Sequence, residues 1–354
     1  MTDRIASWYN TDILSAREEH ARRFWRGEGR YCMSMPFCST HWYRQLFDEE
    51  RMLTEAARWL EAIAGNPGMN FPTFYADLGT ITTAKYWGGK VRPATPDCNI
   101  FIAPAAETLE EALALTPLPV DHPHMDAARA IRLYQQLCTR LDSDLLWLRT
   151  PDFQGVLNTA GMVLEQEEFF VSLYSQPDEA HTFLERICSH LIDFGNYLRT
   201  ASAGKLCGGT WPDIFFPPEL GMMWTEDMMP LLSAPLYREF GIPAVQRMDA
   251  AFGGCCLHCC GAWGQHVPAL RTAGLTLRAV EFHYPLTRIE EIAPLTEQSV
   301  FLPFIILDQQ TIFRSQTDYF RYLIEETDPA YRYWFNVTED TPDAQAFLAE
   351  FWHD

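Results

Sequence analysis

Apolar and polar positions divide this chain into two kinds of segment. Short runs of mainly apolar residues, typical of buried strands, alternate with longer stretches in which apolar residues recur at helical spacing. We expect eight strands, at 31–36, 70–76, 145–149, 205–211, 253–261, 277–282, 300–307 and 331–337. Eight strands that alternate with helices predict an α/β fold of the (β/α)8 TIM-barrel type. A doubly wound sheet is the alternative, but no Gly-x-Gly-x-x-Gly or Walker pattern follows any strand.

Three segments depart from this alternation. Residues 1–30 are charged and helical, which predicts an N-terminal helical extension to the barrel. Residues 81–107 are Pro-rich and irregular, so we expect an inserted irregular or hairpin segment there. Residues 214–230 are rich in Met and Pro and predict a long loop of the kind that forms lids or binding surfaces. We expect one barrel domain over residues 1–354.

The composition excludes several classes of protein. A net charge of −20 repels phosphate, so we expect no binding to nucleic acid or to an anionic membrane. No signal-peptide core and no charge-free run of bilayer length is found, which predicts a cytoplasmic protein. The ten cysteines lie mostly in apolar runs, as expected for reduced, buried thiols.

The most reactive stretch of the chain is Gly253-Gly-Cys-Cys-Leu-His-Cys-Cys-Gly261. On an extended strand, His258 and Cys260 point to the same face and can hold one ion, and a thiolate with an imidazole suits Zn²⁺. A catalytic zinc site needs a third protein ligand and leaves one position open. The other cysteines of the stretch are expected to pack in the core. A Cys-x-x-Cys redox pair is disfavoured because the pattern does not begin a helix.

If the barrel is right, side chains at the carboxyl ends of its strands converge on one pocket. The residues at these positions are Asp77, Trp211, Asp213, His258, Cys260, Glu281, His283, Asp308 and Asn336.

The sequence resembles the uroporphyrinogen decarboxylase-like superfamily over nearly its whole length. It is most similar to the branch of zinc- and corrinoid-dependent methyltransferases. Four segments carry the resemblance: Leu257-His-Cys-Cys-Gly261 as His-x-Cys-Gly, Tyr75-Ala-Asp-Leu78, Leu232-Ser-Ala-Pro-Leu-Tyr-Arg-Glu-Phe240, and Phe335-Asn-Val-Thr-Glu-Asp-Thr-Pro342.

The resemblance implies a (β/α)8 barrel with zinc held by His258, Cys260 and a cysteine after the last strand. No cysteine follows Cys260 in this chain, so the third ligand would be an oxygen or nitrogen donor. The candidates for this ligand are Glu281, His283, Asp77 and Glu339. The decarboxylases of the superfamily carry an Arg-rich loop after strand one, but this chain has Phe37-Cys-Ser-Thr-His-Trp-Tyr-Arg44 there, which disfavours a polycarboxylate substrate.

The leading hypothesis is therefore a methyltransferase that moves a methyl group between a small substrate and a corrinoid or thiol. Asp77 and Glu281 would orient the substrate or move protons, and the corrinoid would come with a partner protein. The substrate-binding residues would be Tyr75, Trp42, Trp211, His283 and Asn336. The alternatives are a metal-free decarboxylase or lyase and a non-catalytic barrel that binds a corrinoid or tetrapyrrole.

Overall fold

The computed structural model describes residues 3–35, 48–66, 68–95, 98, 100–209, 212–308 and 311–352. Their largest sheet is parallel and six-stranded, with the spatial order β1 (Tyr31–Ser34), β10 (Tyr333–Asn336), β9 (Val300–Ile305), β8 (Leu277–Tyr284), β7 (Cys255–His258) and β6 (Met222–Thr225). A second parallel pair is formed by β2 (Thr73–Tyr75) and β5 (Trp147–Arg149). Parallel strands joined through helices make this an α/β fold, as predicted.

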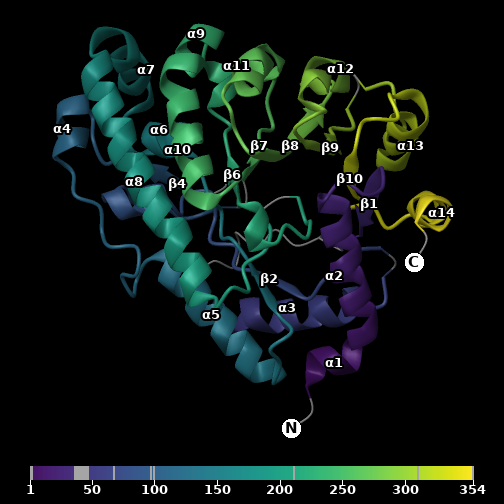
Figure 1. The fold of residues 1–354 in the computed structure, drawn as a ribbon. Helices are drawn as coiled ribbons and strands as arrows, with labels where there is room; N and C mark the ends of the chain where they lie inside the picture. Colours follow the sequence, from purple (N-terminus) through teal and green to yellow (C-terminus); the bar gives the residue numbers. More distant parts are fainter. Residues whose placement is uncertain are drawn as a thin grey trace.

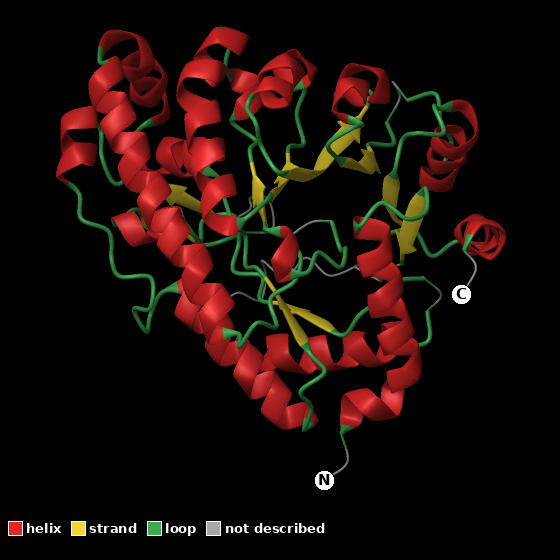
Figure 2. Cartoon of the chain, in the orientation of Figure 1, coloured by secondary structure: helices red, strands yellow, loops and turns green. Residues whose placement is uncertain are grey.

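The helices surround the strands on the outside (Figures 1 and 2). In chain order they are α1 (Arg4–Trp8), α2 (Thr11–Trp25), α3 (Glu49–Ile63), α4 (Leu109–Ala114), α5 (Asp126–Leu141), α6 (Val156–Val163), α7 (Gln166–Ser175), α8 (Pro177–Ala201), α9 (Ala234–Leu236), α10 (Ile242–Phe252), α11 (Val267–Thr272), α12 (Ile289–Ile292), α13 (Gln316–Glu326) and α14 (Pro342–Phe351). Among the residues described, no helix is both long enough and apolar enough to cross a bilayer.

Backbone hydrogen bonds between residues that flank the strands connect the two parallel sheets at both ends. The Met69 N–H donates to the Met33 carbonyl at 2.7 Å, and the Thr225 N–H donates to the Phe153 carbonyl at 2.9 Å. The arrangement is TIM-barrel-like, but the described strands form no continuous closed ladder.

The core is built in two parts because successive strand residues point to opposite faces of the sheet. In β7, Cys255 belongs to the larger apolar cluster that includes the helices, and Cys256 to a smaller cluster on the other face. The N-terminal extension contributes to the smaller cluster, since Phe24 of α2 packs edge-on against Trp334 of β10 at 5.7 Å. The extension is therefore part of the core.

Two sequence predictions in the middle of the chain are wrong. The strand expected at 205–211 is reduced, over its described residues, to one parallel bridge between Leu206 and Leu148. The loop expected at 214–230 contains β6, the edge strand of the main sheet. All four β6 residues are buried, so the strand shows no alternation of apolar and polar positions, and its flanking Met and Pro residues resemble a loop.

Other local predictions are confirmed. The insertion at 81–107 contains an antiparallel hairpin of β3 (Lys90–Arg92) and β4 (Phe101–Ala103). Thr108 and Glu111 form a capping box at the start of α4, in which each side chain accepts a backbone N–H.

Candidate metal centre

Strand pairing brings two distant segments of the chain together at the end of β7. His258 is the last residue of β7 and lies opposite Thr225, the last residue of β6. Just beyond the strands, the Glu226 N–H donates to the His258 carbonyl at 2.7 Å, which extends the pairing. Asp227 and Cys260 each follow their strand by two residues and therefore face one another.

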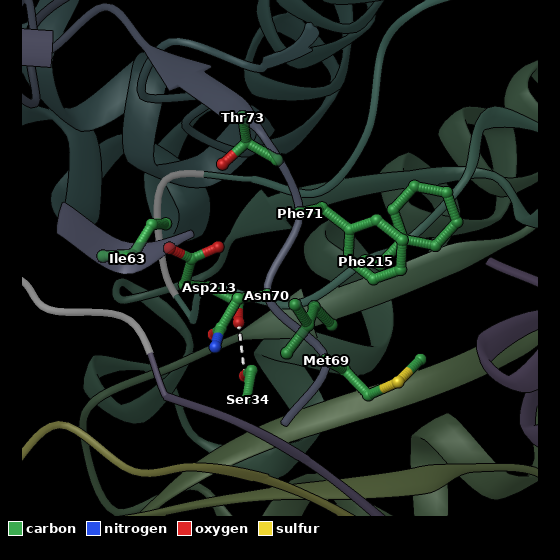
Figure 3. A pocket seen from close by; sticks show the side chains of 9 residues that line it. Ser34, Ile63, Met69, Asn70, Phe71, Thr73, Asp213 and Phe215 are labelled. Atoms are coloured by element: carbon green, nitrogen blue, oxygen red, sulfur yellow. Dashed lines mark hydrogen bonds between the residues drawn. The ribbon is translucent and has the colours of Figure 1, made fainter. Parts of the chain in front are cut away.

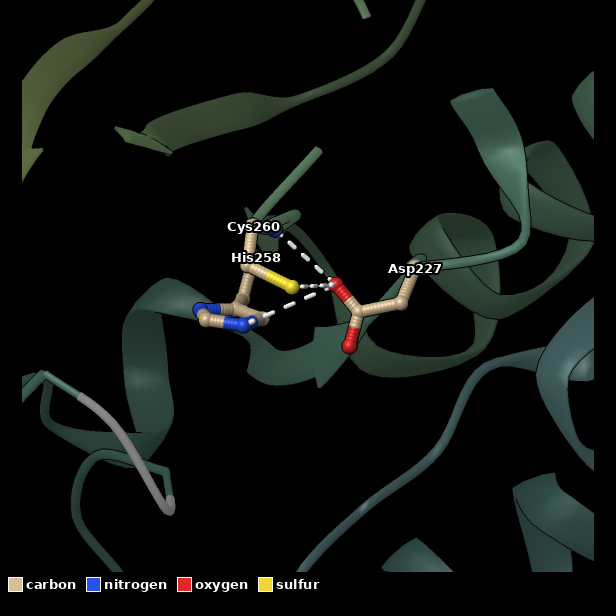
Figure 4. A group of neighbouring side chains, drawn as sticks. All are labelled: Asp227, His258 and Cys260. Carbon is tan, nitrogen blue, oxygen red and sulfur yellow. Dashed lines mark hydrogen bonds and ion pairs between the residues drawn. The ribbon is translucent and has the colours of Figure 1, made fainter. Parts of the chain in front are cut away.

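Asp227, His258 and Cys260 form a compact group of possible metal ligands (Figure 4). Asp227 Oδ1 accepts hydrogen bonds from the Cys260 Sγ at 3.1 Å and from the Cys260 backbone N–H at 2.9 Å. The His258 Nε2 lies 3.8 Å from the same oxygen. One ligand atom from each residue lies within 4.8 Å of the other two, so the three can converge on one ion.

The other ring nitrogen of His258 is held by a buried carboxylate. Glu281 on β8 is 1% exposed, and its two oxygens contact His258 Nδ1 and His283 Nε2, the latter at 3.0 Å. The His283 ring packs tilted against Phe304 with centroids 4.5 Å apart. Glu281 and His283 also satisfy the geometric requirements of a second ligand group with His258.

These contacts fix the charge states around His258. Burial raises the pKa of Glu281, but the charges and hydrogen bonds of His258 and His283 outweigh it and bring the pKa down to about 2. Burial lowers the pKa of His258, but the Glu281 charge, the hydrogen bonds to Cys260 and Glu281, and the Asp227 charge raise it overall to well above 6.5. In the metal-free protein, Glu281 and His258 therefore form a buried ion pair.

The group formed by Asp227, His258 and Cys260 fits zinc in its donor atoms and in the residue that orients its histidine. It offers one oxygen, one nitrogen and one sulfur, and all three donor types are zinc ligands. A histidine that binds a metal through one ring nitrogen usually donates the other N–H to a carboxylate or carbonyl, as Glu281 allows here. The Cys260 thiol proton, directed at Asp227, is the proton that a divalent cation would displace.

A further carboxyl group, Asp152, lies near this centre. Burial raises its pKa to about 7, opposed by the Gln154 hydrogen bond and the His258 charge and assisted by the charges of Asp77 and Asp227. Asp77 follows β2 and is buried, and its Oδ1 accepts the Gly79 N–H at 3.1 Å. The centre therefore combines a metal-ligand group with acidic groups at the ends of other strands.

The remaining predicted residues lie in different surroundings. The Tyr75 ring lies 5.5 Å from the Arg149 guanidinium carbon. The Asn336 side-chain amide donates to the Asp213 carbonyl at 2.6 Å and to Ser34 Oγ at 3.2 Å, so it supports the loop before β6. Trp42 and Trp211 lie outside the described residues.

Two of the four candidates for the third ligand are absent from both ligand groups found among the described residues. Asp77 caps its own turn, and Glu339 Oε1 accepts the Gln316 N–H at 3.4 Å.

A small polar cavity lies between the end of β1 and the start of β2 (Figure 3). Ser34, Asn70, Thr73 and Asp213 contribute polar side chains to its lining. Its volume of about 10 Å³ matches a single water molecule and is too small for a substrate.

Sequence reasoning missed Asp227 and Asp152. Each is an acidic residue that comes shortly after an apolar run, which is the same pattern as at Asp77. Asp152 comes after the strand expected at 145–149, and Asp227 comes after Met222–Thr225. Recognition of that run as a strand would have placed Asp227 among the strand-end residues.

Comparison with known proteins gives a match in structure alone. No family model and no curated protein matches the sequence. A methyltransferase from Methanosarcina mazei superposes with a TM-score of 0.64 over 96% of this chain and 99% of the other, at 13% sequence identity. Identity this low restricts the likeness to the fold, and the two chains share their architecture over almost their full length.

Proposed function

We propose that this protein is a zinc-dependent methyltransferase that moves a methyl group between a small substrate and a corrinoid or a thiol. The observation that carries the proposal is the convergence of Asp227, His258 and Cys260 at the end of β7, with Glu281 on the far nitrogen of His258. The methyltransferase of similar fold supports this class of chemistry. We further propose that the strands complete a (β/α)8 barrel and that a corrinoid is delivered by a partner protein.

Asp227 takes the place of the cysteine that the sequence lacks after its last strand. Zinc bound by Asp227, His258 and Cys260 would supply a Lewis acid that lowers the pKa of a thiol or polarises a methyl-bearing atom. Cys260 is exposed, so the open side of this group faces the substrate. Both oxygens of Glu281 are engaged, and this residue therefore orients His258 and His283.

Asp152 is suited to handle the proton that a thiol substrate releases. A carboxyl group with a pKa of about 7 exists in both forms near neutral pH, which is the requirement for general acid and base catalysis. Asp77 lies close enough to Asp152 to disfavour its charged form, and so keeps a proton available. Tyr75, Trp42 and Trp211 would form the aromatic sides of the substrate pocket.

Metal binding tests the proposal directly. The protein purified without chelator should contain about one zinc per chain, and His258→Ala and Cys260→Ser should each remove most of it. Asp227→Asn keeps the side-chain volume but removes the charge. It should weaken zinc binding by more than about tenfold, the loss found when a residue that only orients a metal ligand is replaced. Glu339→Gln is the matched control because Glu339 lies outside the ligand group. Wild-type protein that takes up no zinc would refute the metal centre.

The second ligand group provides a rival position for the metal. His258, Glu281 and His283 would supply two nitrogens and an oxygen, without sulfur. His283→Gln distinguishes the two groups, because it should leave zinc binding nearly unchanged if Asp227 and Cys260 are the ligands. Methyl transfer that survives both Cys260→Ser and chelation would instead favour the metal-free alternative.

A further inference from the structure

We propose that Asn158 is a positioning residue that holds Asp227 in place as a metal ligand, through a buried chain of amide hydrogen bonds. The inference rests on the metal centre proposed above. It assigns a role to the segment 152–158, which connects the end of β5 to the first turn of α6.

Asp227 needs such support because its own side chain is not packed. The side chain is 36% exposed, and the residue lies in the short segment between β6 and the turn at Met228. A carboxylate in this position contributes to metal affinity only if its backbone is fixed before the metal arrives.

The hydrogen-bond chain begins at the residue that follows Asp227. The Met228 N–H donates to Asn158 Oδ1 at 2.8 Å, and Asn158 Nδ2 donates to Gln154 Oε1 at 2.6 Å. Gln154 Nε2 then donates to the carboxylate of Asp152. Asn158, Gln154 and Asp152 are all buried, and every bond runs in the same direction toward the carboxylate. Neither amide can turn over without the loss of two buried hydrogen bonds.

The other side of Asp227 is fixed by backbone contacts with the same segment. The Gly155 N–H donates to the Thr225 carbonyl at 2.8 Å. Gly155 also lies so close to the chain that a Cβ there would be 2.3 Å from Glu226 Oε1 and 2.9 Å from the Thr225 carbonyl oxygen. The residues on both sides of Asp227 are thus held by a segment that ends in helix α6.

The test measures zinc affinity in the full-length protein by competition with a chromophoric zinc chelator. Asn158→Ala should weaken the affinity by about tenfold or more, the order of magnitude found when a residue that orients a metal ligand is lost. Cobalt-substituted protein should show an altered visible spectrum in the same variant, because the ligand geometry changes. Gln154→Leu removes the support of Asn158 but leaves its bond to Met228, so it should give a smaller loss.

Gln316→Ala is the matched control. Gln316 is also a buried amide, and its Oε1 accepts a backbone N–H, that of Thr338, at 2.8 Å. This variant should lose comparable stability and keep its zinc affinity. If Asn158→Ala does not fold, Gln154→Leu serves as the test.

The outcomes separate the two proposals. Wild-type protein that binds zinc, with unchanged affinity in the folded variants at Asn158 and Gln154, would overturn only the positioning role. Wild-type protein that binds no zinc would overturn the metal centre and the positioning role with it. An equal loss of affinity in Gln316→Ala would show that the effect reflects general destabilisation and would also overturn the inference.

Discussion

Replacement by glutamine should change the free energy of unfolding in opposite directions at two buried glutamates beside the metal centre, Glu281 and Glu226. Glu281 contacts two imidazoles, and its pKa falls to about 2. Burial raises the pKa of Glu226 to about 8, because one hydrogen bond from Trp224 Nε1 at 2.8 Å does not offset it and the Asp227 charge adds to it. Near neutral pH, Glu281 is therefore ionised and Glu226 is mostly protonated. Replacement by Gln keeps the volume of either side chain and removes its ability to ionise.

The magnitudes follow from the distance of each pKa from the ordinary value of 4.5. Each pKa unit corresponds to about 1.4 kcal/mol, so the fall of the Glu281 pKa from 4.5 to about 2 contributes about 3 kcal/mol to folding. This contribution is present above pH 4.5 and is lost as the pH falls toward 2. The raised pKa of Glu226 has the opposite effect on stability. The contribution of this carboxyl group to folding is fully present below pH 4.5 and is lost as the pH rises from 4.5 through 8, because the unfolded chain releases the proton first. At pH 7 the loss is again about 3 kcal/mol.

Urea unfolding of the metal-free protein at several pH values measures both effects. At pH 7, Glu281→Gln should lower the free energy of unfolding by about 3 kcal/mol, and Glu226→Gln should raise it by a similar amount. The effect of Glu226→Gln should disappear at pH 4.5, whereas that of Glu281→Gln should shrink only below this pH. Glu50→Gln is the control: Arg140 also lowers the pKa of this carboxylate, but the pair is exposed and screened by solvent, so the pH profile should change far less than for either buried glutamate.

A change of the free energy of unfolding in the same direction in both variants would refute the opposite charge states of Glu281 and Glu226. If both glutamine variants are destabilised at pH 7 by an amount that does not change with pH, packing determines their effect and the charge states assigned here are wrong.

Three further predictions concern the fold and the metal. Gly221→Ala should destabilise the protein by about 3 kcal/mol or more in urea unfolding, because φ is +126° there and a Cβ would lie 1.9 Å from the Gly254 carbonyl oxygen. An unfolding midpoint equal to that of the wild type would contradict this. Arg149→Met should cost up to about 3 kcal/mol in the same assay, because it removes the partner of Asp213, whose carboxylate is 3.0 Å away and only 16% exposed. The added change Asp213→Leu should recover much of this loss, and no recovery would show that the charge is not the cause. Zinc at 100 times its dissociation constant should stabilise the folded protein by about 2.7 kcal/mol in the same assay, and Cys260→Ser should abolish this stabilisation. Equal stabilisation of the wild type and of the Cys260→Ser variant would show that the metal binds elsewhere.

Much of the fold could be predicted because its signals are local. Apolar runs and helix caps depend on residues a few positions apart, and the strand at Cys255–His258, the capping box at Thr108 and the insertion at 81–107 were predicted on that basis. The tendency of free cysteine to be buried predicted core positions for Cys255, Cys256 and Cys259, and all three are buried.

The strand Met222–Thr225 could not be predicted in this way. It is buried on both faces, and its place in the sheet depends on pairing with Cys255–His258, which the local sequence does not encode. The register of that pairing also decides which acid meets the metal-binding motif.

The sequence by itself predicted His258 and Cys260 as a pair of possible ligands, because a spacing of two on an extended strand gives two side chains a common face. The strand is shorter than expected and ends at His258, but the two residues still lie in one group of possible ligands. Only the tertiary structure decided their partners. Asp227 is 33 residues from Cys260 along the chain, and Glu281 is 23 residues from His258. Both come into contact because β6 and β8 lie on either side of β7. The physical reason is that parallel strands place residues distant in sequence side by side, in a register set by the packing of the whole sheet.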